Sequence, residues 1–209
     1  MERSPSLYPL SQKSLLEGIS HLCEIDSDLS IVVDGLGNPP LWSREPGFPT
    51  MIHIILEQQV SLASARAAFS KLELAAGGLT PERFLEFTDT ELREIGFSRQ
   101  KTIYGRALSG SILNGMLDFG ELHRLDDTTA RNKLMKIKGI GPWTADIYLL
   151  MALLRPDVFP SGDLALAKAV KEIKNLAETP DPKNLHKIAE QWKPWRAIAA
   201  RILWHYYLN

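Results

Sequence analysis

Apolar and polar positions follow helical spacing along most of the chain, and the alternation typical of strands is nearly absent. The clearest case is MIHIILEQQVSLASARAAFSKLELA (51–75), whose pattern predicts a buried helix, a break near Gln58–Ser61 and a second, amphipathic helix. Similar patterns, bounded by Ser, Thr, Asp, Pro and Gly, predict further helices at 11–24, 80–87, 88–96, 98–113, 128–137, 143–154, from 163, at 186–193 and 194–208. The sequence therefore predicts an all-α fold, with two helical lobes and a cleft between them.

One connection between predicted helices has an unusual composition, KGIGPWTAD (138–146). A dinucleotide-binding loop would need a preceding strand and a third glycine where Thr144 stands, and a Walker loop would need Gly-Lys-Ser/Thr. Two interpretations remain open: a plain glycine-rich turn, or a helix–hairpin–helix whose amides bind a DNA phosphate. In the second, Gly139 and Gly141 permit left-handed backbone and the close approach of another chain, and Pro142 suits the first helical turn.

Charge is distributed unevenly along the chain, although the net charge is only −1. The first 130 residues carry 11 Lys and Arg against 18 Asp and Glu, whereas residues 131–209 carry 13 against 7. This basic part contains the Gly-x-Gly connection, so it indicates either a footprint for a polyanion or a solvated helix face.

Composition narrows the class of protein. With 44% apolar and 23% charged residues the chain falls in the globular range. Cys23 is the only cysteine, which excludes an internal disulfide framework and any cysteine-held iron–sulfur or zinc site. The sequence has no run of eighteen apolar residues and no signal-peptide layout at its start, so neither a transmembrane helix nor secretion is expected. We expect a reducing compartment: the cytoplasm or nucleoid of a bacterium or archaeon, or the nucleus of a eukaryote.

The longer strings around the connection resemble the helix–hairpin–helix DNA glycosylase superfamily. They are LMKIKGIGPWTADIYLL (134–150) and RPDVFPSGDLALAKAV (155–170), and the resemblance extends to ILEQQVS (55–61) and WKPWRAIAARILW (192–204). Within the superfamily the sequence is most similar to the type II 3-methyladenine DNA glycosylases of alkylation repair. The resemblance covers roughly 45–205. It implies one glycosylase unit over 1–209, with an N-terminal helix and loop (1–45), a hairpin at 134–154 and no N-terminal β domain.

The resemblance also implies the residues that contact DNA. The hairpin set that would hold a backbone phosphate is Lys138, Gly139, Ile140, Gly141 and Thr144, with Lys136 as a further positive charge. The wedge that fills the gap left by a flipped base would come from Gln58, Gln59, Val60 and Ser61, with Gln59 at the plugging position. The other interpretation of this segment is a polar break whose amides cap the next helical turn. Hairpins of this superfamily often hold a monovalent cation, here through backbone carbonyls of Met135, Ile137 and Ile140, although no side-chain pattern indicates one.

The catalytic residue that the resemblance implies is Asp163, in PSGDLALAK. A fixed carboxylate stabilises the oxocarbenium-like sugar that forms when an N-glycosidic bond breaks, and it helps to orient or deprotonate water. The alternative role is an N-cap, since Gly-Asp before an apolar helix is a normal start. The two roles are compatible. Asp157 does not match the family position, and Asp146 is expected to make only local hydrogen bonds within the hairpin.

Trp143 and Trp204 match the aromatic positions of the family's base pocket, and ordinary core packing is the alternative for both. Electron-rich rings select a positively charged alkylated purine by stacking and cation–π attraction. Superfamily members that also cut the strand carry a lysine where Trp143 stands, and tryptophan cannot form an imine, so we expect no lyase activity. A pocket aromatic one turn later is replaced by Ile147, which leaves the range of lesions open.

These features together predict a monofunctional DNA glycosylase that excises 3-methyladenine, and related adducts such as 7-methylguanine, from duplex DNA in base excision repair. It would act as a monomer without a cofactor, an iron–sulfur cluster or a membrane. Two alternatives remain: a helix–hairpin–helix DNA-binding protein without catalysis, and a glycosylase for mismatched or oxidised bases.

Overall fold

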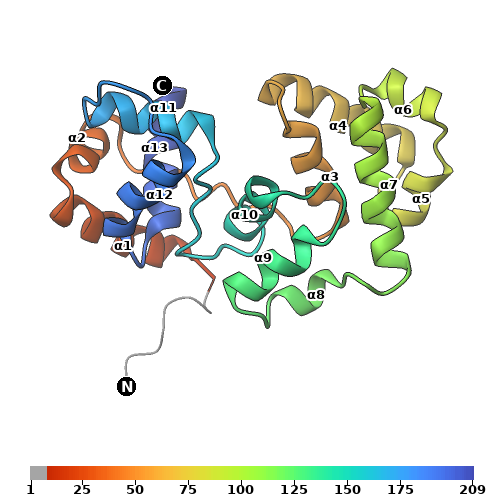
Figure 1. Cartoon of the computed structure of the whole chain (residues 1–209), viewed down its shortest axis with the longest axis horizontal. Coiled ribbons are helices and arrows are strands. Elements are labelled where there is room, and N and C mark those ends of the chain that lie inside the picture. Colours follow the sequence, from red (N-terminus) through yellow and green to blue (C-terminus); the bar gives the residue numbers. More distant parts are fainter. Residues whose placement is uncertain (1–8) are drawn as a thin grey trace. The chain divides into compact units, whose positions relative to one another are not determined.

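The all-helical prediction is confirmed by the computed structural model, which describes residues 9–209 and contains no strand in that range. The first eight residues, where the sequence analysis found no signal-peptide layout, lie outside this range. The chain divides into two compact units (Figure 1). The first unit combines the chain up to Ser43 with Leu149–Asn209, and the second is Arg44–Tyr148. Within residues 9–209, no helix is long and apolar enough to cross a membrane.

The first unit is built around its C-terminal helix. Its elements are α1 (Gln12–Ile25), α2 (Ser27–Leu36), α11 (Leu164–Ile173), α12 (Pro182–Ala189), the 3₁₀ helix η2 (Glu190–Trp192) and α13 (Arg196–Leu208). Helix α13 packs against α1, α2 and α11, and its residues from Ala197 to Trp204 are all buried. Helix α1 approaches it at Gly18, where a Cβ would lie 2.2 Å from the Cδ1 of Ile198. A larger residue at Gly18 would therefore push α1 away from α13.

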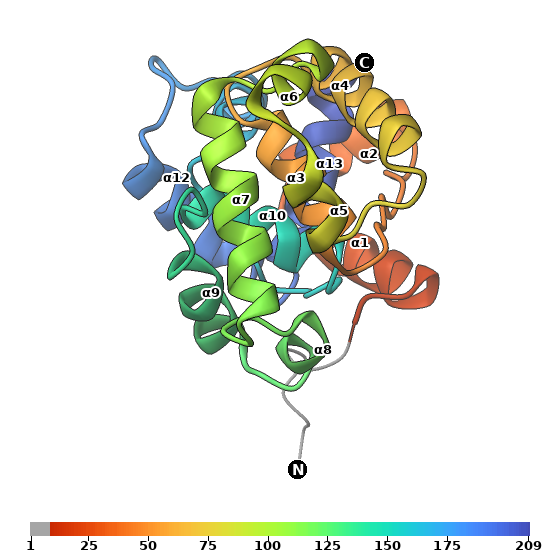
Figure 2. The ribbon, with the colours of Figure 1, turned by 90° about the vertical axis from the view of Figure 1, so that its right-hand side faces the viewer.

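The second unit holds the remaining helices. They are α3 (Phe48–Glu57), α4 (Leu62–Ala76), α5 (Pro81–Glu86), α6 (Asp89–Ile95), α7 (Arg99–Leu113), α8 (Phe119–Leu122), α9 (Asp127–Met135) and α10 (Pro142–Met151), whose last three residues belong to the first unit. Helix α3 packs against α4 and α7, and Figure 2 looks onto α7 with α5 and α6 beside it. The predicted break between two helices at Gln58–Ser61 is confirmed, since α3 ends at Glu57 and α4 begins at Leu62.

Local capping explains where several helices start. The Thr88 hydroxyl accepts a hydrogen bond from the Glu91 amide while the Glu91 carboxylate accepts one from the Thr88 amide, which is the capping box that the sequence predicts. Ser98 caps α7, and Thr80 caps α5 with Pro81 at the first helical position. The starts of these helices are therefore encoded by neighbouring residues.

Several boundaries differ from the sequence prediction: helix α12 begins at Pro182 rather than at 186, α8 was not predicted, and two further differences have a clear local cause. Residues 27–36 form helix α2, although the segment up to 45 was expected to be a loop after the first helix; the carboxylate of Asp26 accepts hydrogen bonds from the Asp28 and Leu29 amides and so starts a second helix. Helix α10 ends at Met151 rather than at 154. Leu154 adopts a left-handed conformation, with φ of 53°, and the Arg155 amide donates to the Leu149 carbonyl at 3.0 Å just past the end of the helix.

Arg201 anchors α13 from inside the first unit. Its guanidinium is fully buried and donates to the carbonyl oxygens of Leu41 at 2.8 Å, Ala197 at 2.9 Å and Leu150 at 2.9 Å. Burial lowers the pKa of Arg201 to about 9. In the sequence, Leu41 and Leu150 lie within two residues of the two unit boundaries, Ser43/Arg44 and Tyr148/Leu149. The bonds from Arg201 therefore anchor these two segments to α13, the helix that carries Trp204.

A second buried polar cluster joins α2, α11 and η2 in the first unit. Asp26 accepts hydrogen bonds from the Trp192 indole at 2.8 Å and from the Lys174 ammonium at 2.9 Å. Burial by itself would raise the pKa of Asp26, but the hydrogen bonds from Trp192 and Lys174 lower it overall. The cluster therefore stabilises the first unit only while the carboxylate is ionised.

We expect Asp26→Asn to lower the free energy of unfolding at pH 7 by about 1–3 kcal/mol, because asparagine keeps the cap but leaves Lys174 without its buried carboxylate. The lowered pKa means that the ionised carboxylate contributes fully above its unfolded pKa of about 4, and that the contribution disappears as the pH falls through the folded value. Urea unfolding at pH 7 and pH 3 should show the difference from wild type shrinking at pH 3. Asp28→Asn, which removes the exposed partner of Lys174, is the control and should cost less than about 1 kcal/mol. A difference that is equally large at both pH values would contradict this role of the charge.

Candidate active site and DNA-binding hairpin

The structure places Asp163 at the N-terminus of α11, where its side chain caps the helix. Its Oδ1 accepts a hydrogen bond from the Leu166 amide at 3.0 Å. The indole N–H of Trp204 donates to the same oxygen at 3.3 Å. These two donors, one from the first turn of α11 and one from α13, fix the orientation of the carboxylate. Asp163 is half-buried.

Trp204 is the predicted aromatic residue that the structure brings to Asp163. It lies in α13, which packs directly against α11, and only 9% of the residue is exposed. The indole therefore packs in the first unit as core tryptophans do, while its N–H end reaches the carboxylate. The packing interpretation of Trp204 is therefore confirmed, and its role as a residue of the base pocket stays a prediction.

The acidic residues Asp157 and Asp146 are each paired with an arginine. Asp157 receives two hydrogen bonds from the Arg196 guanidinium, each of 2.9 Å. Asp146, in α10 of the second unit, accepts a hydrogen bond from Arg131 Nε of α9 at 2.6 Å, so it braces the two helices of the hairpin. This local role of Asp146 is the one that the sequence predicted.

The Gly-x-Gly connection is a tight turn between α9 and α10. The Ile140 amide donates to the Ile137 carbonyl at 3.0 Å, and the Ala145 amide donates to the Gly141 carbonyl at 3.0 Å, which starts α10. Gly139 adopts a left-handed conformation with φ of +93°, and a Cβ there would lie 2.0 Å from the Tyr104 ring. Only glycine fits this position.

Gly141 does not adopt the left-handed backbone that glycine permits. It is absent from the residues with positive φ, because its carbonyl already serves the first turn of α10 and its backbone is that of a helix start. No atom lies within 4 Å of where its Cβ would be, so the space beside it is open. Gly141 therefore leaves room for the approach of another chain, whereas Gly139 is required by internal packing.

The remaining hairpin residues divide into buried and exposed sets. Ile137 and Ile140 are buried, and the predicted contact residue Thr144 is only 2% exposed, so any contact from Thr144 to DNA would come from its backbone and not from its hydroxyl. Lys136 and Lys138 are exposed and supply positive charge beside the turn. Met135 and Ile137 lie at the end of α9 and in the turn, and the carbonyl of Ile137 retains a second lone pair for the predicted cation after binding the Ile140 amide.

The predicted wedge residues form the turn between α3 and α4. Gln58 ends α3, and its side-chain amide donates to the carbonyl of Gly139 at 3.0 Å and to the Thr144 hydroxyl at 2.9 Å. Gln59 is exposed and has a positive φ of 57°, and Val60 is 46% exposed. Ser61 caps α4 by accepting a hydrogen bond from the Ser64 amide. The structure thus separates the four residues: Gln59 and Val60 are accessible, while the side chains of Gln58 and Ser61 are used within the second unit.

Two residues that shape this region were missed by the sequence analysis. The ring of Tyr104 packs against Gly139, and the ammonium of Lys101 donates to the Leu56 carbonyl at 2.7 Å at the end of α3. Both come from α7, more than thirty residues away from their partners in sequence. No local pattern marks such contacts, because they depend on how α7 packs against α3.

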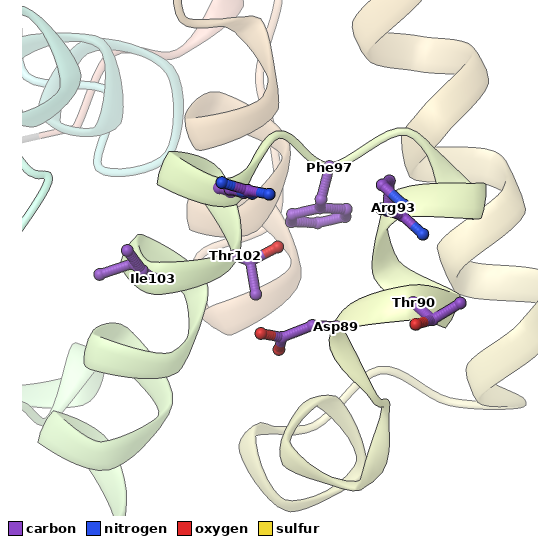
Figure 3. A pocket seen from close by; sticks show the side chains of 7 residues that line it. Asp89, Thr90, Arg93, Phe97, Thr102 and Ile103 are labelled. Atoms are coloured by element: carbon purple, nitrogen blue, oxygen red, sulfur yellow. The ribbon is translucent and has the colours of Figure 1, made fainter.

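A separate pocket of about 350 Å³ lies between α6 and α7 (Figure 3). It is lined by Asp89, Thr90, Arg93, Phe97, Arg99, Thr102 and Ile103. None of the predicted site residues lines it, and Asp89 is paired with Arg106 at 2.6 Å. Among residues 9–209, no group of three or more His, Cys, Asp or Glu side chains is placed to hold a metal ion.

Comparison with known proteins identifies the class to which this fold and this hairpin belong. The family model of the HhH-GPD superfamily base excision DNA repair proteins matches residues 52–194, which is more than half of the chain. The chain therefore belongs to this superfamily.

Particular relatives have names from alkylation repair. The putative DNA-3-methyladenine glycosylase YfjP of Bacillus subtilis is 30% identical over 85% of this chain, and the chain spans 65% of that protein's length. The alkylbase DNA glycosidase-like protein mag2 of Schizosaccharomyces pombe is 30% identical over 88% of this chain and 90% of its own length. The solved structure of the S. pombe 3-methyladenine DNA glycosylase Mag1 in complex with abasic DNA is similar with a TM-score of 0.85 and 28% identity, covering 90% of this chain and 95% of that one.

Proposed function

We propose that this protein is a DNA glycosylase that removes alkylated purines such as 3-methyladenine from duplex DNA and leaves an abasic site. The observation that carries the proposal is the Asp163 carboxylate, fixed at the N-terminus of α11 by the Leu166 amide and the Trp204 indole. The names of the relatives, and the abasic DNA bound to the similar Mag1 structure, support the same activity.

The chemistry follows from where the carboxylate stands. As the bond between the sugar C1′ and the purine N9 breaks, its electron pair leaves with the base, and an alkylated, positively charged purine departs as a neutral molecule. Positive charge develops on the sugar, and the nearby Asp163 carboxylate stabilises it. Water then adds its oxygen to C1′ and gives a proton to the carboxylate, which acts as general base. The two hydrogen bonds to Oδ1 hold the carboxylate in place through both events.

The aromatic residues supply selectivity in this proposal. A cationic purine is attracted to the electron-rich face of tryptophan, whereas a normal neutral base gains only stacking. Trp204 stands beside the catalytic carboxylate, and Trp143, in the first turn of α10, provides the second predicted aromatic face. Ile147 has no aromatic ring to offer a base, so the pocket relies on fewer rings than the family pattern has.

DNA binding is assigned to the hairpin and to the α3–α4 turn. The open space beside Gly141 admits a phosphate to the first amides of α10, with the helix dipole and the exposed Lys136 and Lys138 adding attraction. Gln59, exposed at the tip of the turn, fills the space that the flipped nucleotide leaves. A monovalent cation at the carbonyls of Met135, Ile137 and Ile140 would further fix the hairpin. The whole chain works here as one enzyme unit, acting as a monomer where the cell keeps its DNA.

The strand is left intact in this proposal. A lyase would attack C1′ with a lysine amine and form an imine, but the corresponding position is Trp143, whose indole nitrogen is not a nucleophile of that kind. The product is therefore an abasic site, and another enzyme must cut the strand.

The test is release of free base from a duplex treated with a methylating agent, followed by chromatography for 3-methyladenine and 7-methylguanine. We expect base release without strand cleavage, and no covalent complex on addition of borohydride. A panel of duplexes with mismatched or oxidised bases should give much slower release. DNA binding without release of any base would instead support a non-catalytic protein, and borohydride trapping would overturn the assignment as monofunctional.

A further inference from the structure

The Gln58 side chain ties the turn between α3 and α4 to the hairpin. Gln58 Nε2 carries two protons, and the structure uses both: one bond reaches the Gly139 carbonyl at 3.0 Å and the other reaches the Thr144 hydroxyl at 2.9 Å. Only 2% of Thr144 is exposed, so the hydrogen bond between Gln58 and the Thr144 hydroxyl is shielded from water. All three residues belong to the second unit.

These two hydrogen bonds exclude insertion of Gln58 into the base stack and leave it a role in positioning the turn. An amide whose two protons are bound to the hairpin cannot at the same time enter the base stack of a duplex. The neighbouring Gln59 is exposed, and its φ of 57° turns its side chain away from the path of α3. A non-glycine residue adopts this conformation only where its surroundings hold it. Gln58 lies directly before it, and the Ser61 cap of α4 lies two residues after it.

A third contact supports the same turn. The Lys101 ammonium donates to the carbonyl of Leu56, two residues before Gln58, at 2.7 Å. From the same helix α7, Tyr104 packs against Gly139, the residue whose carbonyl receives the Gln58 amide. Helix α7 therefore contacts both ends of the Gln58 connection, and the turn and the hairpin form one braced assembly.

We propose that Gln58 is a positioning residue that couples phosphate binding at the hairpin to insertion of Gln59 at the flipped nucleotide. Its side chain transmits the position of the hairpin to the α3–α4 turn, so that a duplex held at Gly141 meets Gln59 in a fixed register. The proposal rests on the proposed function, because it assigns Gln58 a part in base flipping. It replaces the sequence-based assignment of Gln58 to the wedge itself.

The main test compares Gln58→Leu with wild type in single-turnover excision of 7-methylguanine from a defined duplex. We expect the rate to fall about tenfold to a hundredfold, the effect of misplacing a positioned group by about 1 Å. Affinity for undamaged duplex should change less than threefold, since the hairpin amides are untouched. Gln191→Leu, an exposed glutamine of η2 in the first unit, is the matched control and should behave as wild type.

A second substrate separates positioning from general damage to the enzyme. A lesion that lies opposite an abasic site is not base-paired, so no base pair has to be broken when the nucleotide flips. Flipping is therefore easier on this duplex and depends less on Gln59. The rate of Gln58→Leu should recover to within about threefold of wild type on this duplex. If the deficit is equally large on both duplexes, the role in flipping is wrong.

Stability is controlled with a paired variant. Gln58→Leu alone leaves the buried Thr144 hydroxyl without its donor, whereas Gln58→Leu combined with Thr144→Val removes both members of that hydrogen bond and should regain part of the thermal stability; the Gly139 carbonyl lacks its Gln58 donor in both variants. Excision by the double variant should stay as slow as that of Gln58→Leu. Recovery of the rate together with stability would show a merely structural role and overturn the proposal.

Failure of the proposed function would look different. In that case the wild-type protein itself would release no base. Flipping can still be followed by the fluorescence of 2-aminopurine placed beside the lesion, which rises on unstacking. We expect a rise with wild type and a smaller one with Gln58→Leu; an equal rise for both would refute the coupling whether or not excision occurs.

Discussion

Asp163→Asn is expected to reduce base release at least about a thousandfold while the protein remains folded. Asparagine cannot supply the negative charge that stabilises the sugar cation, nor can it take a proton from water. It still accepts a hydrogen bond from the Leu166 amide, and asparagine caps helices as well as aspartate does. Single-turnover release of 7-methylguanine measures the loss, and thermal unfolding and duplex affinity should match wild type closely.

Two further variants make this expectation specific. Asp163→Ala should be equally inactive but also about 1 kcal/mol less stable, because the cap of α11 is lost. Asp157→Asn removes a carboxylate from the same loop that is held by Arg196, and it should keep the activity of wild type. Activity of Asp163→Asn within tenfold of wild type would show that another group performs the chemistry.

The second large effect is expected from Gly139→Ala. A Cβ at this position would lie 2.0 Å from the Tyr104 ring, and alanine disfavours the φ of +93°. Overpacking and backbone strain together should lower the free energy of unfolding by about 3–5 kcal/mol, as measured by urea unfolding. Because the same turn presents the amides at the start of α10, DNA binding should be lost with stability.

Gly141→Ala provides the matched control within the same turn. Its Cβ would meet no atom within 4 Å and its backbone needs no positive φ, so stability should change by less than about 1 kcal/mol. The added methyl group would occupy the space through which a phosphate reaches the amides of α10. We therefore expect weaker duplex binding and a shallower salt dependence without unfolding. Equal loss of stability in both variants would contradict the division of labour between the two glycines.

Most helices could be predicted from the sequence because their starts are encoded locally. Thr88 with Glu91, Ser98 and Thr80 before Pro81 all cap the helices that follow them, as their spacing predicts. Helix α2 was missed because Asp26, which caps it, directly follows α1, leaving no loop between the two helices for a pattern to reveal. The early end of α10 was not predicted because the left-handed backbone that follows it lies at Leu154 and not at a glycine, which would have marked the position in the sequence.

The candidate site could be predicted in part. Asp163 and Trp204 are predicted because each stands in a string that resembles the family; the structure joins them by a hydrogen bond, and their roles in the site stay predictions. The contacts of Gln58, Lys101 and Tyr104 could not be predicted, since they connect segments that meet only after α7 packs against α3. The different roles of Gly139 and Gly141 depend on the same packing.

The position of Asp163 at the start of α11 has a consequence for a cell that carries the asparagine variant. The variant would fold normally and would not be degraded as a misfolded protein, because asparagine caps α11 as well as aspartate does. Given the proposed function, such a protein would persist at normal abundance, settle on lesions and shield them from any other repair enzyme. Without the gene, other repair enzymes could still reach the lesions. With this single substitution, the inactive protein would occupy the lesions and block those enzymes.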